Sequence, residues 1–189
     1  KSTYGNLEWS IFSQFNEDGY INEAMKRLFE FDQKLTRTAV EFGSGGYSSN
    51  IGLLSSTFNC KCLLVDGSKS ALQNIDRLLN TSMKLIPVAR KNLIFIHQLL
   101  DRKNLHQDIH TIIGETIPTL ASVDIDSFDE LIITELMELR VPIIIGEYNA
   151  CFSPQTSLST YHPSQSHNMI KINSRLLPAY GISYLKMLE

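Results

Sequence analysis

Apolar and polar positions along the chain follow two spacings. Over residues 20–31, apolar side chains recur at helical intervals, which predicts an amphipathic helix. Short apolar runs rich in β-forming residues predict strands, and helical stretches separate one run from the next. The predicted strands lie at 38–42, 62–65, 93–97, 120–123 and 143–149, and the further helices at 51–58, 68–79, 105–113 and 129–139. This alternation predicts an α/β fold with a doubly wound, mostly parallel sheet.

The same pattern divides the 189 residues into parts of a single domain, 1–189. We expect residues 1–35 to form a helical cover, 36–150 to form the cofactor-binding α/β core, and 170–189 to form a C-terminal helix. Residues 151–169 are rich in Ser, Thr, Gln, His and Pro, and their apolar residues follow neither the helical nor the strand spacing. Because this segment follows the end of a predicted strand, it is either a substrate lid or an irregular excursion.

Composition narrows the class of partner and the compartment. The formal net charge of -3 and the pI near 6.0 provide no basic field, so nucleic acid is excluded as the main partner and a small molecule is favoured. No apolar run approaches the roughly 18 residues of a membrane span. The cysteines are odd in number and lack paired metal-ligand spacing (Cys60, Cys62 and Cys151). We therefore expect a reduced, cytoplasmic protein without a membrane partner.

A glycine-rich turn follows the first predicted strand. Gly43 and Gly45 come directly after the run 38–42, and glycine permits turn geometries and close ligand approach that other residues do not. Asp66 ends the second predicted strand, roughly 20 residues later, where a neighbouring parallel strand would present a carboxylate to ribose hydroxyls. The three residues predict a site for a nucleoside-containing cofactor. The alternative is an ordinary turn between strand and helix that binds no ligand.

A dinucleotide is one class of cofactor that this turn could bind. A dinucleotide fingerprint requires the spacing G-x-G-x-x-G, and Gly43 and Gly45 satisfy its first half. Ser48 occupies the third position, where glycine would allow close packing of the helix. The dinucleotide fingerprint is therefore incomplete.

Polar side chains also end the fourth and fifth predicted strands. Asp124 and Asp126 follow the run 120–123, and Glu147 and Asn149 end the run that begins at residue 143. The carboxyl ends of parallel strands share one edge, where ligands of open α/β sheets bind. These side chains could accept a proton from a substrate hydroxyl, or Asp124, Glu147 and Asn149 could hold Mg²⁺ or Ca²⁺ with hard oxygen ligands. The alternative is that Asp126 or Ser127 caps the helix predicted at 129–139 while the other acids face solvent.

Taken together, these motifs resemble class I S-adenosylmethionine (SAM) methyltransferases related to the FkbM type. The matching pieces are Ser-Gln at 13–14 with Glu-Asp at 17–18, Val-Glu-Phe-Gly at 40–43 with Ser-Asn at 49–50, Leu-Leu-Val-Asp-Gly at 63–67, Ser-Val-Asp-Ile-Asp at 122–126 with Asp129, and Glu-Tyr-Asn at 147–149. The resemblance implies a Rossmann-like class I methyltransferase fold that binds SAM. It adds Glu41 and Asn50 to the cofactor residues, and we expect Asp101 or Asn104, after the third strand, near the adenine.

The chain departs from the family pattern at several positions. Ser127 replaces a usual glycine, Asp66 replaces a commoner glutamate, and the glycine turn at 43–46 is a variant. Because the sequence stops at Glu189, we expect it to lack the antiparallel strand pair that closes the family's sheet.

The predicted function is that of an O-methyltransferase. It would use SAM, with or without Mg²⁺, to methylate a hydroxyl of a sugar or secondary metabolite. Asp124, Asp126, Glu147 and Asn149 are the candidate catalytic residues. The alternatives are an NAD-binding oxidoreductase and a ligand-binding module of the same fold that is degenerate or truncated and transfers no methyl group.

Overall fold

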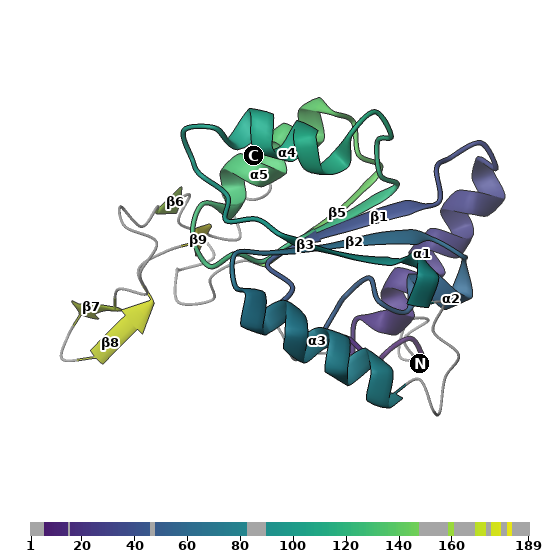
Figure 1. Ribbon diagram of the computed structural model, residues 1–189, viewed down its shortest axis with the longest axis horizontal. Helices are drawn as coiled ribbons and strands as arrows, with labels where there is room; N and C mark the ends of the chain where they lie inside the picture. Colours follow the sequence, from purple (N-terminus) through teal and green to yellow (C-terminus); the bar gives the residue numbers. More distant parts are fainter. Residues whose placement is uncertain are drawn as a thin grey trace.

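The computed structural model describes residues 6–14, 16–45, 48–82 and 90–147, together with four short strands further along the chain (Figure 1). These short strands are β6 (Ser159–Thr160), β7 (Met169–Ile172), β8 (Arg175–Pro178) and β9 (Gly181–Ile182). No helix in the described part of the chain has both the length and the apolar character needed to cross a membrane.

Five parallel strands form the central sheet, in the order β3-β2-β1-β4-β5. They are β1 (Thr38–Phe42), β2 (Lys61–Asp66), β3 (Leu93–His97), β4 (Leu120–Val123) and β5 (Ile143–Gly146). β1 pairs with both β2 and β4, so the strand order reverses beside β1. The predicted α/β fold with a doubly wound parallel sheet is confirmed, and it is Rossmann-like. Within the described residues, this sheet contains no antiparallel strand.

Helices cover both faces of the sheet (Figure 1). One face carries α1 (Asp18–Phe31), α2 (Leu54–Thr57) and α3 (Lys69–Ser82), and the other carries α4 (Leu105–Ile113) and α5 (Asp129–Glu138). A 3-10 turn at Arg90–Asn92 leads into β3.

The side chains of β1 alternate between the two helical layers, and the whole strand is buried. Ala39 packs in the core beneath α1, α2 and α3, with Met25 and Ile75. Val40 and Phe42 pack in the core beneath α4 and α5. A strand buried on both faces reads as a near-continuous apolar run, which is the pattern that predicted it.

The polar stretch before α1 fixes the N-terminal segment against the core. The buried carboxylate of Asp18 accepts hydrogen bonds from the backbone amides of Phe12 (2.7 Å) and Ser13 (3.2 Å). The carbonyl of Phe12 in turn accepts a hydrogen bond from the amide of Ser49, in the loop after β1. This segment therefore supports the loop that follows the glycine turn.

Two cysteines lie at the start of β2. Cys60 and Cys62 are both free thiols with no exposed surface. Burial raises the pKa of Cys60 to about 11 and raises that of Cys62 well above its usual value. The prediction that Cys62 lies in a buried strand is confirmed.

The C-terminal segment differs from the expected helix over 170–189. β7 and β8 pair antiparallel, with Ile172 opposite Arg175, and β6 pairs antiparallel with β9. Two short apolar runs flank the polar pair Asn173 and Ser174, a sequence that fits a hairpin as well as a helix. The lid or excursion predicted at 151–169 lies outside the described residues, apart from β6 and the first residue of β7.

Candidate functional site

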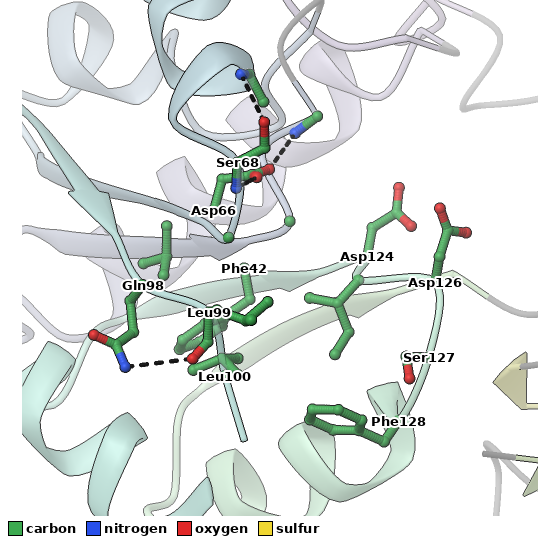
Figure 2. A pocket seen from close by; sticks show the side chains of 16 residues that line it. Phe42, Asp66, Ser68, Gln98, Leu99, Leu100, Asp124, Asp126, Ser127 and Phe128 are labelled. Carbon is green, nitrogen blue, oxygen red and sulfur yellow. Dashed lines mark hydrogen bonds between the residues drawn. The ribbon is translucent and has the colours of Figure 1, made fainter. Parts of the chain in front are cut away.

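A cavity of about 390 Å³ opens at the carboxyl ends of the central strands. It lies where the strand order reverses between β1 and β4, the position at which open α/β sheets bind their ligands. The residues that line it come from the ends of β1, β2 and β3 and from the segment after β4 (Figure 2). They are Phe42, Gly43, Gly45, Val65–Ser68, Ala71, Gln98–Leu100 and Asp124–Phe128.

Gly43 closes the junction between β1 and β4. Its backbone has a φ of 82°, and a Cβ at this position would overlap the carbonyl oxygen of Asp124. The amide of Asp124 also donates to the carbonyl of Phe42 (2.9 Å). Gly43 is therefore required by the close approach of two backbone segments of the protein itself.

Gly45 has a different environment. Its φ is 47°, and among the described residues a Cβ at this position would meet only the carbonyl oxygen of Gly43, 3.8 Å away. Its amide donates a hydrogen bond to the carboxylate of Asp66 (3.2 Å), which also accepts the amide of Ser68 (2.6 Å; Figure 2). The turn after β1 and the end of β2 are thus joined through one carboxylate that faces the cavity.

Glu41 lies behind the glycine turn, in the core. Its carboxylate accepts hydrogen bonds from the hydroxyl of Ser49 (2.6 Å) and from the amide of Asn50 (2.9 Å). The side-chain amide of Asn50 donates to the hydroxyl of Ser122 on β4 (3.0 Å). Burial raises the pKa of Glu41 to about 7, although these hydrogen bonds oppose the shift. Glu41 and Asn50 therefore hold the loop after β1 in place, and neither lines the cavity.

Three carboxylates gather on the other side of the cavity. β4 and β5 pair Val123 with Gly146, which places Asp124 beside Glu147. One carboxylate oxygen from each of Asp124, Asp126 and Glu147 lies within 4.8 Å of the others. In Figure 2, the side chains of Asp124 and Asp126 extend in the same direction from the segment after β4.

The crowding of negative charge alters the protonation of Asp124. Although its side chain keeps access to solvent, partial removal from water and the charges of Glu147 and Asp126 raise its pKa to about 8. Such a group exchanges a proton near neutral pH. The oxygen set also fits a hard cation such as Mg²⁺, since it offers three carboxylates at two neighbouring strand ends.

Asp129 holds the backbone of the acidic segment. Its carboxylate accepts hydrogen bonds from the amides of Ile125 (2.8 Å) and Ser127 (3.0 Å). Asp126 has a φ of 56° in the turn that results. The alternative that Asp126 or Ser127 caps α5 is wrong, because Phe128 occupies the N-cap position and no side chain makes a capping hydrogen bond there.

Several residues of the cavity were not predicted as site residues. Gln98 and Leu99 face it from the segment after β3, and Phe128 faces it from the start of α5. The hydroxyl of Ser127 is buried at the cavity wall and has no hydrogen-bond partner within the described part of the chain. Only the departure of Ser127 from the family's glycine could have marked that position.

The predicted site residues divide into three groups. Gly43, Gly45, Asp66, Asp124 and Asp126 line the cavity, and Glu147 lies beside it. Glu41, Asn50 and Asp101 do not line it; Asp101 is exposed and accepts the amide of Lys103. Asn149 lies outside the described residues.

The charged side chains that line the cavity all have the same sign. Asp66, Asp124 and Asp126 are acidic, and no lysine, arginine or histidine is present among the described lining residues. A ligand that carries positive charge is therefore favoured there over a polyphosphate.

Comparison of the sequence with models of known protein families gives no match, and comparison with curated proteins gives none either. The structure shows a Rossmann-like α/β fold that is consistent with nucleotide binding. The resemblance to FkbM-type methyltransferases rests on the short motifs described above.

Proposed function

We propose that this protein binds S-adenosylmethionine and transfers its methyl group to a hydroxyl of a small molecule, such as a sugar or secondary metabolite. The observation that carries the proposal is the acidic cavity at the reversal of strand order. SAM has a positive sulfonium and a positive ammonium group. NAD carries a pyrophosphate, which the carboxylates of Asp66 and Asp126 at the cavity would repel.

Asp66 is the residue proposed to bind the ribose. It ends β2 beside the glycine turn, and a carboxylate there suits two vicinal hydroxyls. Two amides occupy only part of its acceptor capacity, since a carboxylate has about four acceptor sites. Gly45 leaves open space for the methionine portion, and Leu99 offers an apolar surface to the adenine.

Asp124 is the residue proposed to accept the proton of the substrate hydroxyl. When bound, SAM would supply an electrophilic methyl carbon, and S-adenosylhomocysteine would leave as the bond from that carbon to the substrate oxygen forms. The hydroxyl proton passes to the ionised carboxylate of Asp124, the form that predominates above its pKa of about 8. The cavity walls hold the reactants in line, which can provide much of the acceleration.

A divalent cation is the alternative means of activating the hydroxyl. Asp124, Asp126 and Glu147 would hold Mg²⁺, which supplies polarisation of a hydroxyl oxygen when bound. Asn149, which lies outside the described residues, was also predicted to contribute a ligand, and this stays a prediction.

An NAD-binding oxidoreductase is less well supported. Dinucleotide folds place the pyrophosphate at the N-terminus of the helix that directly follows the glycine turn. Here α2 has only 4 residues and begins at Leu54, after a loop that Ser49 organises.

The first prediction concerns cofactor binding. Calorimetric titration should show binding of S-adenosylhomocysteine and SAM in the micromolar range, and no binding of NADH. Asp66→Asn should weaken binding of S-adenosylhomocysteine by roughly 10- to 100-fold, because it removes a charged acceptor of hydrogen bonds. Glu115→Gln is the matched control. Glu115 is exposed and precedes the amino end of β4, away in sequence from the cavity residues, so this variant should bind like the wild type. Binding of NADH alone, or of neither ligand, would contradict the proposal.

The second prediction separates chemistry from binding. Asp124→Asn should retain binding of S-adenosylhomocysteine but lose turnover by about 10²- to 10⁴-fold. The assay follows transfer of a radiolabelled methyl group to a panel of sugars and phenolic metabolites, with and without EDTA. Loss of wild-type turnover in EDTA, with recovery in Mg²⁺, would assign the carboxylates to a cation. Unchanged turnover in the variant would remove Asp124 from both roles.

A further inference from the structure

A second cluster of metal-ligating side chains lies between α4 and α5, on the layer that covers one face of the sheet (Figure 1). His106 and His110 are four residues apart on α4, so they project from the same face of the helix. Their rings lie with centroids 4.3 Å apart. A histidine pair at this spacing can chelate one metal ion.

α5 supplies a third side chain to this pair. The carboxylate of Glu135 lies 2.8 Å from Nδ1 of His106. One ligand atom from each of His106, His110 and Glu135 lies within 4.8 Å of the others. The cluster is distinct from the cavity, whose lining includes none of the three residues.

We propose that His106, His110 and Glu135 form a binding site for Zn²⁺ or a similar transition-metal ion that links α4 to α5. Two imidazole nitrogens and one carboxylate oxygen are ligands that Zn²⁺ commonly takes from proteins, with a fourth position left to water. The imidazole ligands also give this site a different metal preference from that of the acidic cluster at the cavity, where hard oxygen ligands favour Mg²⁺.

The geometry requires only side-chain adjustment. Ligand bonds of about 2.0–2.2 Å in a tetrahedron place ligand atoms roughly 3.3 Å apart. The side chain of His106 is 70% exposed, so it can rotate without disturbing the core, whereas Glu135 is 23% exposed and more firmly placed. Because the ligands come from two helices, the bound ion would resist their separation and stabilise the folded protein.

The direct test is calorimetric titration of the untagged protein with zinc chloride. We expect one Zn²⁺ per chain. His110→Ala and Glu135→Ala should each weaken Zn²⁺ binding by more than about tenfold. Loss of a residue that only supports a metal ligand already costs about tenfold, and loss of a ligand itself should cost more. His97→Ala is the matched control, since His97 contacts the carbonyl of Gly67 and is not a member of the cluster, and it should bind Zn²⁺ like the wild type. Co²⁺ should give the visible absorption of a four-coordinate site, and that absorption should disappear in His110→Ala.

Thermal unfolding provides a second readout. Zn²⁺ should raise the melting temperature of the wild type and of His97→Ala, but not of His110→Ala. All variants should melt alike in EDTA, which shows that they fold. The proposal is overturned if Zn²⁺ binding is unchanged in His110→Ala, or if it is lost only in a His162→Ala/His167→Ala variant. Neither result affects the proposed binding of SAM.

Discussion

At the scale of single residues, acidic side chains near the ends of different strands perform different tasks. Glu41, Asp66 and Asp124 each lie near the end of an apolar run, and each was predicted to contact a ligand. The structure places Asp66 and Asp124 at the cavity and Glu41 behind it, hydrogen-bonded to Ser49 and Asn50. Sequence spacing alone could not separate them, because burial depends on how the following loop folds back.

Glu41 makes the protein's stability depend on pH. Its pKa is about 7 in the folded protein and about 4.5 when exposed, so the folded state retains a proton that the unfolded state loses. The stabilisation is fully present below pH 4.5 and is lost as the pH rises through 7. Glu41→Gln does not titrate, so its stability relative to the wild type should increase by up to about 3 kcal/mol between these values.

Urea unfolding of both proteins between pH 4.5 and 8 measures this difference. Groups other than Glu41 are common to the two proteins and cancel in the comparison. Glu115→Gln, whose carboxylate is exposed, should follow the wild type throughout. If the curves for the wild type and Glu41→Gln run parallel, the assigned pKa is wrong.

At the scale of elements, the junction of β1 with β4 decides the shape of the cavity. Gly43 and Gly45 are chemically identical and share a positive φ, but of these two described glycines Gly43 alone is pressed against another backbone segment. The distinction depends on the register of β1 with β4, which no local pattern reveals.

Alanine substitution should separate the two glycines. Gly43→Ala should destabilise the protein by at least about 3 kcal/mol, since it combines a strained φ with overlap at Asp124. Gly45→Ala should cost about 1 kcal/mol of stability, from backbone strain alone, but should weaken cofactor binding because the new methyl group enters open space at the cavity. Urea unfolding measures the first effect and calorimetric titration the second. Equal losses of stability in the two variants would contradict this assignment.

Long amphipathic elements were the most predictable. The helices expected at 20–31, 105–113 and 129–139 correspond closely to α1, α4 and α5. The helix expected at 51–58 is reduced to α2, and the hydroxyl of Ser49 accepts the amides of Ile51 and Gly52 ahead of it. The helix expected at 170–189 is replaced, where the structure describes it, by strands; short apolar runs there fit either period.

At the scale of the whole molecule, the parallel sheet explains why so much of the candidate site could be predicted. Once strands are parallel, their carboxyl ends share one edge, so Gly45, Asp66 and Asp124 had to lie near one another. Gln98, Ser127 and Phe128 could not be foreseen, since their place at the cavity depends on the loops after β3 and β4. The histidine cluster required knowledge that α4 and α5 are neighbours.

Two buried thiols, at the first residue before β2 and within it, can report on opening of the folded structure in solution. Cys60 and Cys62 sit under the sheet's helical cover with their thiolate forms suppressed, so a water-soluble thiol reagent can modify them only during transient opening of the structure. In a Cys151→Ser background, the rate of thiol labelling therefore measures how often the structure opens. A cofactor bound at the carboxyl ends of the strands would lower this rate, even without any contact with Cys60 or Cys62.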